Sequence, residues 1–270
     1  MRKLFYLIPL LLCASAWGQV VASGKVSVSG GVTFSATAAS CTLPTNCGTV
    51  ESWYDGASLY CTSALCSSAG TSATAINDLS GNGNTVTLNN NATDCQYEPT
   101  LYNGQPGMVL AGNCQSSSIL HAPLAWSTSA TFIFVGSTAD ALDEQGIIAG
   151  TTNPQPTYRI NSSTQPDFVI PASADIVHGA TLTVNTVYDL SASYNSSTGA
   201  GSLTNNGSAD GSATNAHAIT NGITTLFYEP NSSCCVFAGH FLEIIIFIPA
   251  LTSTQLSNLH ANYLVPKYGI

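Results

Sequence analysis

The chain has 270 residues, only 7% of them charged, and its 14 acids outnumber five basic residues to give a formal net charge of −9. Ordinary soluble domains carry roughly 25% charged residues. Nucleic-acid binding needs clustered lysine and arginine to neutralise phosphates, and an acidic balance also opposes docking on anionic lipid. The composition therefore argues against a nucleic-acid partner and leaves hydroxyl and amide groups as the main surface chemistry.

The first 18 residues, MRKLFYLIPLLLCASAWG, have the pattern of a secretory signal peptide. Arg2 and Lys3 precede an apolar run over residues 4–12, and small residues suited to a signal peptidase follow. The run is too short to span a bilayer, and no other stretch approaches the length needed. We therefore expect a secreted, extracellular protein without a membrane span. Its mature chain keeps three basic residues against 14 acids, a formal charge of −11.

Residues 19–50 are rich in Ser, Thr, Gly and Ala and contain one alternating run, KVSVSGGVTF, at 25–34. We predict a leader with one strand. Further along the chain, short apolar or alternating runs are separated by Gly, Asn, Pro and Ser clusters, which is the pattern of an all-β sandwich. The predicted strands are 85–88, 107–110, 131–136, 146–149, 156–160, 167–170, 181–184, 187–194, 201–205, 223–228 and 236–248.

The cysteines suggest disulfides, because eight remain after the signal peptide and an even number in an exported chain usually pairs. Eight cysteines allow 105 pairings. Proximity favours three local bridges, Cys41–Cys47, Cys61–Cys66 and Cys95–Cys114. The remaining two, Cys234 and Cys235, are adjacent, and Cα atoms about 3.8 Å apart lie below the usual disulfide range of about 4.4–6.8 Å. We predict a strained vicinal bridge there, with a more distant partner for each cysteine as the alternative.

The loop NDLSGNGNTVTL at 77–88 has glycines at a spacing that invites comparison with a phosphate-binding loop. Such loops open a helix and carry further glycines or a lysine at fixed positions. Here a strand-like run follows and lysine is absent, so Asn82-Gly83 is predicted to be a turn. Asp78 is a candidate calcium ligand, since calcium accepts carboxylate, amide and backbone oxygens. A loop with a single acid is more often only a loop.

Later signals define a hairpin, a buried strand and a helix. Asn206-Gly207 between two strand-like runs predicts a two-residue hairpin. The apolar run at 241–247 predicts a strand in the middle of a sheet. Thr252 and Gln255 form a capping-box pair, and apolar residues with helical spacing follow them. The chain is therefore expected to end in one helix.

Five stretches resemble the bacterial laminin-G-like domains of the concanavalin A-like lectin/glucanase superfamily. They are WYDGAS at 53–58, NDLSGNGN at 77–84, the P-x-x-x-x-x-N-G-x-P-like segment within 99–106, FAGHFLEIIIF at 237–247 and the ending YLVPKYGI at 263–270. The resemblance covers about residues 51–270, after a signal peptide at 1–18 and the leader at 19–50. It implies an all-β fold, a two-sheet antiparallel jelly-roll sandwich with a short C-terminal helix. Members bind glycans, cell surfaces or proteins, and some relatives hydrolyse polysaccharides, so the fold alone does not choose a function.

Catalytic signatures are missing from the sequence. The E-x-D-x-x-E-like run of the related glucanases does not occur, nor does a G-x-S-x-G or H-E-x-x-H motif. The densest acidic cluster, Asp140, Asp143 and Glu144, falls in a predicted loop. It suits calcium better than hydrolysis, and a solvated turn is the alternative. We therefore assign no catalytic residue, and calcium is the candidate cofactor.

Aromatic rings near predicted strands are candidates for stacking on sugars, with core packing as the alternative. These are Trp126, Tyr158, Tyr194 and Tyr228. A bridged Cys234–Cys235 loop would offer a second, rigid apolar contact. The sequence thus predicts a secreted carbohydrate- or surface-binding module whose partner is a glycan or a glycosylated surface. The alternatives are a polysaccharide-active hydrolase or lyase with a dispersed acid pair, and a structural or adhesive surface protein.

Overall fold

The computed structural model describes residues 25–28, 32–35, 41–89, 93–111, 114–116, 129–139, 144–150, 157–169, 176–214, 223–228 and 236–270. The chain divides into two compact units, Met1–Ser40 and Cys41–Ile270. In the first unit β1 (Lys25–Val28) and β2 (Val32–Ser35) pair as an antiparallel hairpin. The alternating run expected to form one strand therefore forms two.

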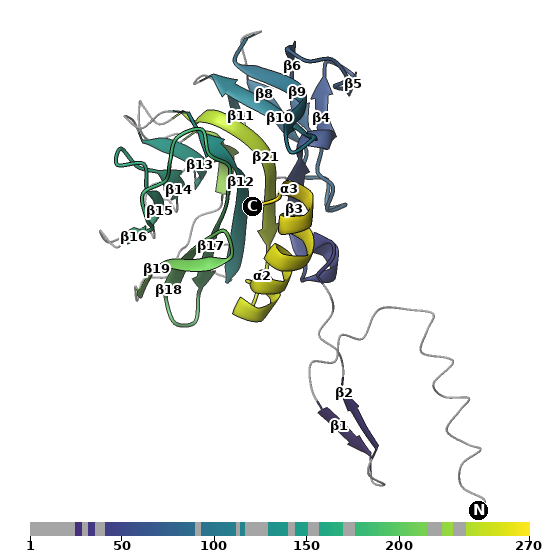
Figure 1. Cartoon of the computed structure of the whole chain (residues 1–270), viewed down its shortest axis with the longest axis vertical. Helices are drawn as coiled ribbons and strands as arrows, with labels where there is room; N and C mark the ends of the chain where they lie inside the picture. Colours follow the sequence, from purple (N-terminus) through teal and green to yellow (C-terminus); the bar gives the residue numbers. More distant parts are fainter. Residues whose placement is uncertain are drawn as a thin grey trace, which may run out of the picture. The chain divides into compact units, whose positions relative to one another are not determined.

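The second unit is built from antiparallel sheets (Figure 1). The large sheet has the order β19-β18-β17-β12-β21-β10-β9-β6, and β3 also pairs with β21. Its strands are β3 (Val50–Asp55), β6 (Thr71–Ser72), β9 (Cys95–Tyr102), β10 (Gln105–Ala111), β12 (Ala130–Thr138), β17 (Tyr188–Asn195), β18 (Ala200–Asn205), β19 (Ser208–Thr214) and β21 (Ala238–Phe247).

Two smaller sheets complete the unit. The second sheet has the order β16-β15-β14-β13-β20 and the third β11-β8-β7-β4-β5. The strands of the second sheet are β13 (Gln145–Gly150), β14 (Thr157–Ile160), β15 (Pro166–Val169), β16 (Ile176–His178) and β20 (Ile223–Leu226). Those of the third are β4 (Leu59–Cys61), β5 (Ala64–Leu65), β7 (Ala75–Ile76), β8 (Val86–Asn89) and β11 (Gln115–Ser116).

The helical segments include the predicted C-terminal helix. They are η1 (Pro44–Asn46), η2 (Gly56–Ser58), α2 (Ser253–Leu259), η3 (His260–Leu264) and α3 (Val265–Tyr268). Thr252 caps α2, accepting a hydrogen bond from the Gln255 backbone N–H while its own N–H donates to Gln255 Oε1. Among the described residues, no helix is long and apolar enough to cross a membrane.

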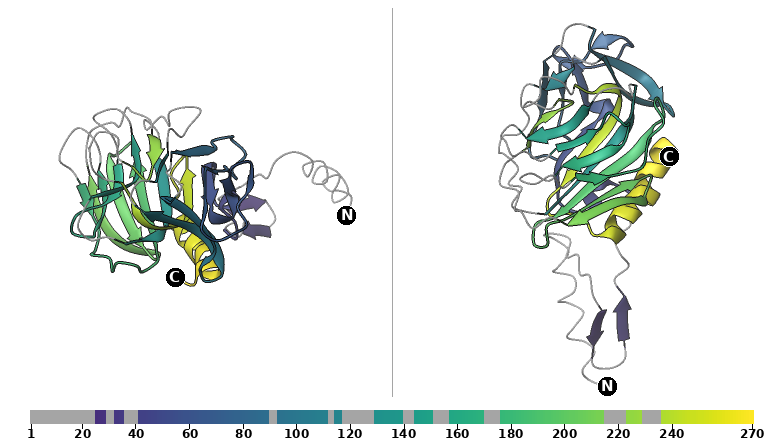
Figure 2. Two further views of the ribbon diagram at one scale, coloured as in Figure 1. Left: turned by 90° about the horizontal axis from the view of Figure 1, so that it is seen from above. Right: turned by 90° about the vertical axis from the view of Figure 1, so that its left-hand side faces the viewer.

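Strand β21 is apolar on both faces because both faces are covered. Ile244 and Ile246 point between the sheets, whereas Ile245 and Phe247 pack under the C-terminal helix. Figure 2 shows that helix, in yellow, on the face of the large sheet opposite the second sheet. The antiparallel jelly-roll sandwich with a short C-terminal helix, expected from the sequence, is therefore confirmed.

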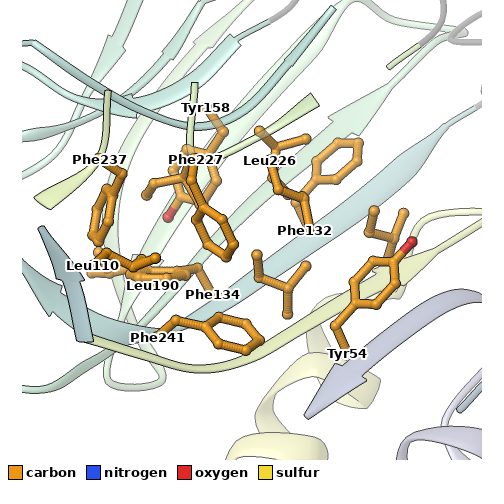
Figure 3. Close-up of a cluster of buried hydrophobic side chains, with 14 of the residues drawn as sticks. Tyr54, Leu110, Phe132, Phe134, Tyr158, Leu190, Leu226, Phe227, Phe237 and Phe241 are labelled. Carbon is orange, nitrogen blue, oxygen red and sulfur yellow. The ribbon is translucent and has the colours of Figure 1, made fainter. Parts of the chain in front are cut away.

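Aromatic rings fill the space between the large and second sheets (Figure 3). Phe134 and Phe237 meet edge to face with centroids 5.3 Å apart, and Phe227 and Phe241 do the same at 5.3 Å. Such pairs add stabilisation beyond their buried area. Because one face of the second sheet packs on this core, the residues that alternate with the core residues lie on its other face.

The second unit begins at Cys41 and so includes residues 41–50, which the sequence assigns to the leader. The Cys41–Cys47 bridge forms as predicted, and both cysteines are buried beside the C-terminal helix. Gln255 Nε2 donates to the Cys47 carbonyl at 2.5 Å. The bridge thus fastens residues 41–47 to the sandwich, although their composition is that of a leader.

Two of the remaining predicted disulfides lie within the described residues. Cys61–Cys66 and Cys95–Cys114 form as expected. Cys234 and Cys235 lie outside the described residues, so their vicinal bridge stays a prediction. The strand expected at 181–184 is a loop instead. Its alternation does not follow one sheet face, because Leu182 is buried and Val184 is exposed.

The Asn206-Gly207 turn joins β18 to β19 as predicted, with positive φ at both residues. A Cβ atom on Gly207 would lie 2.3 Å from His260 Cδ2, so the turn packs directly against the helical segment. His260 Nδ1 in turn lies 2.8 Å from Asp189 Oδ2 on β17.

We therefore expect Gly207→Ala to lower the free energy of unfolding by more than its backbone cost alone. Positive φ costs a non-glycine residue about 1–2 kcal/mol, and overpacking adds about 1–3 kcal/mol. Gly83→Ala is the matched control, since Gly83 also has positive φ but open space around it. Urea unfolding monitored by circular dichroism measures both variants. Equal losses would mean that the contact with His260 contributes nothing.

Candidate functional site

The outer face of the second sheet is the candidate surface, because the C-terminal helix covers the outer face of the large sheet. Successive side chains of a strand point to opposite faces. In β14, β15 and β16 the residues that enter the core are Tyr158, Ile160, Phe168 and Val177. Their neighbours Arg159, Asp167 and His178 consequently lie on the opposite face of the sheet.

These three residues stand directly opposite one another on adjacent strands. Arg159 pairs in register with Asp167, and Asp167 pairs with His178. Glu144, just before β13, and Asn161, just after β14, extend the set at its ends. We call these five residues the polar row: Glu144, Arg159, Asn161, Asp167 and His178.

Asp167 is the centre of the polar row. Its Oδ1 accepts from Asn161 Nδ2 at 3.0 Å and lies 2.7 Å from His178 Nδ1. Its Oδ2 lies 3.8 Å from Arg159 Nε, and Arg159 Nη1 donates to Glu144 Oε2 at 2.8 Å. The buried carboxylate therefore holds the imidazole by a hydrogen bond and lies within ion-pair distance of the guanidinium group.

Exposure increases along the row from its centre to its ends. The side chain of Asp167 is 1% exposed and that of Arg159 14%, whereas Glu144 is 38% and His178 54% exposed. Asp167 holds the imidazole through Nδ1, which leaves Nε2 for a ligand. Planar groups fixed in this way suit directional hydrogen bonds to paired hydroxyl or carboxylate oxygens.

Two of the four aromatic residues predicted to stack on sugars lie in the core. Tyr158 and Tyr194 are each 1% exposed and belong to the core between the sheets. Their interpretation as sugar-stacking residues is therefore corrected, because neither ring has a face open to a ligand. Tyr228 is half-buried just after β20. Trp126 lies, with Cys234 and Cys235, outside the described residues.

Asp78 serves as a structural acceptor, and its role as a calcium ligand stays a prediction. Oδ1 accepts from the backbone N–H groups of Trp53 at 3.0 Å and Ser80 at 2.9 Å. Oδ2 accepts from the Asn84 N–H at 2.9 Å and the Ser80 hydroxyl at 2.7 Å. Four donors occupy the buried carboxylate, and they hold the 77–84 loop against β3.

The other candidate metal ligands do not form a set in the described part of the chain. Glu144 is paired with Arg159, while Asp140 and Asp143 lie outside the described residues. Among the residues that are described, no group of three or more His, Cys, Asp or Glu is placed to hold a metal ion. A calcium site at 140–144 stays a prediction.

Sequence reasoning missed Arg159, Asp167 and His178 as a group. Each looks unremarkable alone, in the stretches TYRI, PDFV and IVH. The sequence did contain a signal for this group, because each of the three stretches places a charged or titratable residue next to a core residue in a short strand. Only the strand order brings the three together.

No family model matches the chain, and no curated protein matches it. Among solved structures, domain 4 of AbnA, a GH43 extracellular arabinanase from Geobacillus stearothermophilus in complex with arabinotriose, is similar. The TM-score is 0.55 at 16% identity, covering 78% of this chain and 98% of that one. Trypanosoma rangeli sialidase matches with a TM-score of 0.54 at 10% identity, over 78% of this chain.

The chain spans only 32% of the sialidase. At such identities the similarity shows the fold alone. Both neighbours come from carbohydrate-active proteins and are consistent with the concanavalin A-like fold that the motifs suggested.

Proposed function

We propose that this chain is a secreted glycan-binding module and that the polar row contacts the sugar. The observation that carries the proposal is the buried Asp167, which hydrogen-bonds His178 and lies within ion-pair distance of Arg159, each in register with it on a neighbouring strand of the second sheet. Hydroxyl-rich ligands need such preoriented hydrogen-bonding groups. The acidic chain, poor in basic residues, fits a neutral glycan better than a polyanion.

The similarity to a domain that was solved with arabinotriose supports a glycan as ligand class, without naming the sugar. A hydrolase is the second candidate, because two carboxylates, Glu144 and Asp167, flank the same guanidinium group. Retaining and inverting glycosidases both work with a pair of carboxylic acids. The adhesive alternative requires neither binding of a small glycan nor hydrolysis.

A glycan array with the secreted protein, in calcium and then in EDTA, tests the proposal. We expect saturable binding to one glycan class. His178→Ala should weaken binding about 5–10-fold, because one lost hydrogen bond is worth about 1 kcal/mol and 1.4 kcal/mol is tenfold. Val184→Ala, at an exposed residue of another segment, is the surface control. Arg159→Lys keeps the charge but loses the planar fork, so it should also weaken binding.

Other outcomes separate the alternatives. Binding that His178→Ala and Arg159→Lys leave unchanged would place the site away from the polar row. Release of reducing sugar, lost in Glu144→Gln, would favour the hydrolase. Loss of binding in EDTA would direct attention to the 140–144 segment. Absence of both binding and hydrolysis would favour the adhesive alternative.

A further inference from the structure

A second cluster lies on the other side of the molecule, where β3, β21 and α3 meet (Figure 1). Asp55 ends β3 and stands directly opposite Glu243 of β21. Lys267 of α3 reaches both carboxylates. Two tyrosines and a tryptophan enclose them. We call this set the lysine cluster: Trp53, Asp55, Glu243, Tyr263, Lys267 and Tyr268.

Glu243 is fully buried and surrounded by donors. Its Oε1 accepts from Trp53 Nε1 at 2.6 Å and from the Tyr263 hydroxyl at 2.6 Å. Its Oε2 accepts from the Tyr268 hydroxyl at 2.8 Å and from Lys267 Nζ at 3.2 Å. Lys267 Nζ lies 5.0 Å from the centroids of both tyrosine rings. The amine is thus held in a largely dry, aromatic pocket.

Asp55 is oriented by two different contacts on its two oxygens. Its Oδ1 accepts from the Ala57 backbone N–H at 2.7 Å, and its Oδ2 contacts Lys267 Nζ. The amine therefore faces the carboxyl group from the side of Oδ2. The side chains of Asp55 and Lys267 are 11% and 17% exposed, so little water competes for this contact.

We propose that Lys267 and Asp55 join through an intramolecular amide bond, formed by the folded protein itself. The Nζ atom attacks Cγ of Asp55, the Cγ–Oδ2 bond breaks, and Oδ2 leaves as water. Of the three protons on the lysine ammonium group, one stays on the amide nitrogen and two leave with the water. The reaction is a condensation, so it needs no oxidant, reductant or external co-reactant.

Neighbouring groups supply the chemistry that the step requires. Glu243 Oε2, 3.2 Å from Nζ, takes a proton from the amine and returns it to the leaving oxygen. Burial raises the pKa of Glu243, opposed by the Lys267 charge, and a raised pKa makes the carboxylate a stronger proton acceptor. The Ala57 N–H stabilises the negative charge that develops on Oδ1 in the tetrahedral intermediate. The fold keeps the two reacting groups in contact, which replaces a bimolecular encounter.

The bond would connect the two ends of the second unit. Asp55 and Lys267 are 212 residues apart, whereas the three disulfides close separations of only 6, 5 and 19 residues. The disulfides among the described residues therefore provide no covalent link between β3 and the C-terminal helix. An amide at this place closes almost the whole sandwich into one loop and is not sensitive to reductants. This inference does not depend on glycan binding.

Intact mass spectrometry of the full secreted protein after complete reduction tests the proposal. We expect a mass lower than that of the reduced sequence by one water. Digestion at aromatic residues should then give one branched fragment that contains both Asp55 and Lys267. Lys267→Arg keeps the positive charge but cannot form this amide, so it should show the full mass. Glu243→Gln keeps an acceptor oxygen and should slow the bond or prevent it.

Two results would overturn the proposal. One is wild-type protein with the full mass after prolonged incubation. The other is a lost water that fragmentation places elsewhere in the chain, or that persists in Lys267→Arg. Fragment mapping of the wild-type protein gives an answer even if a variant fails to fold.

Discussion

Glu243→Ala is expected to lower the free energy of unfolding by about 3–5 kcal/mol, because it removes the acceptor shared by four buried or half-buried donors. Trp53 and the two tyrosines of the lysine cluster would lose the partner that holds the C-terminal helix to β21. A buried donor without a partner pays the full cost of its lost hydration. Urea unfolding followed by tryptophan fluorescence measures the loss.

Glu243→Gln is the matched control for this prediction. Glutamine keeps one carbonyl oxygen for Trp53 and Tyr263, and Lys267 keeps Asp55 as its counter-ion. Relative to wild-type protein in which Asp55 and Lys267 are not yet joined, we expect a loss of about 1.5–3 kcal/mol, the cost typical of a hydrogen bond to a charged group. If alanine and glutamine destabilised the protein equally, the charge rather than the acceptor positions would hold the helix.

Asp78→Ala is expected to cost about 3 kcal/mol or more, because three backbone N–H groups in the 77–84 loop and at Trp53 would lose their acceptor. The loop should detach from β3, since it is this carboxylate that joins the two. Asp78→Asn keeps one acceptor oxygen but turns an amide group toward a donor, so its loss should be intermediate. Thermal unfolding by calorimetry compares the three proteins.

Calcium separates this structural role from a metal site. Four donors already occupy the Asp78 carboxylate, so addition of calcium should leave the unfolding temperature of wild type and Asp78→Ala equally unchanged. A ligand that binds only the folded state raises its stability by mass action. A calcium-dependent rise in wild type that disappears in Asp78→Ala would show that Asp78 is a calcium ligand.

Local sequence patterns predicted much of the fold because they act over a few residues. The capping pair Thr252 and Gln255 starts the helix, and Asn206-Gly207 makes the hairpin turn, because each depends on backbone geometry within one turn. The three short disulfides follow from proximity in the chain. The apolar run at 241–247 becomes the central strand β21, since a strand covered on both faces needs no polar alternation.

The sequence does not determine whether an aromatic ring in a strand is buried or exposed. A tyrosine in a strand has the same pattern whether its ring enters the core or faces a ligand. Tyr158 and Tyr194 are buried in the core because they lie on the faces of their strands that pack against the opposite sheet. Burial of a whole ring contributes more than most surface contacts, and only the packing of the sheets decides which face is inside.

By itself, the sequence determined an acidic β-sandwich with local disulfides and a capped C-terminal helix, and it carries the secretory pattern. Only the tertiary structure decided the two clusters. Arg159, Asp167 and His178 meet because β14, β15 and β16 are neighbours in register, and Asp55 meets Lys267 across 212 residues because α3 packs beside β3. Such juxtapositions depend on strand order and layer packing, which are non-local and leave no mark in the spacing of the residues.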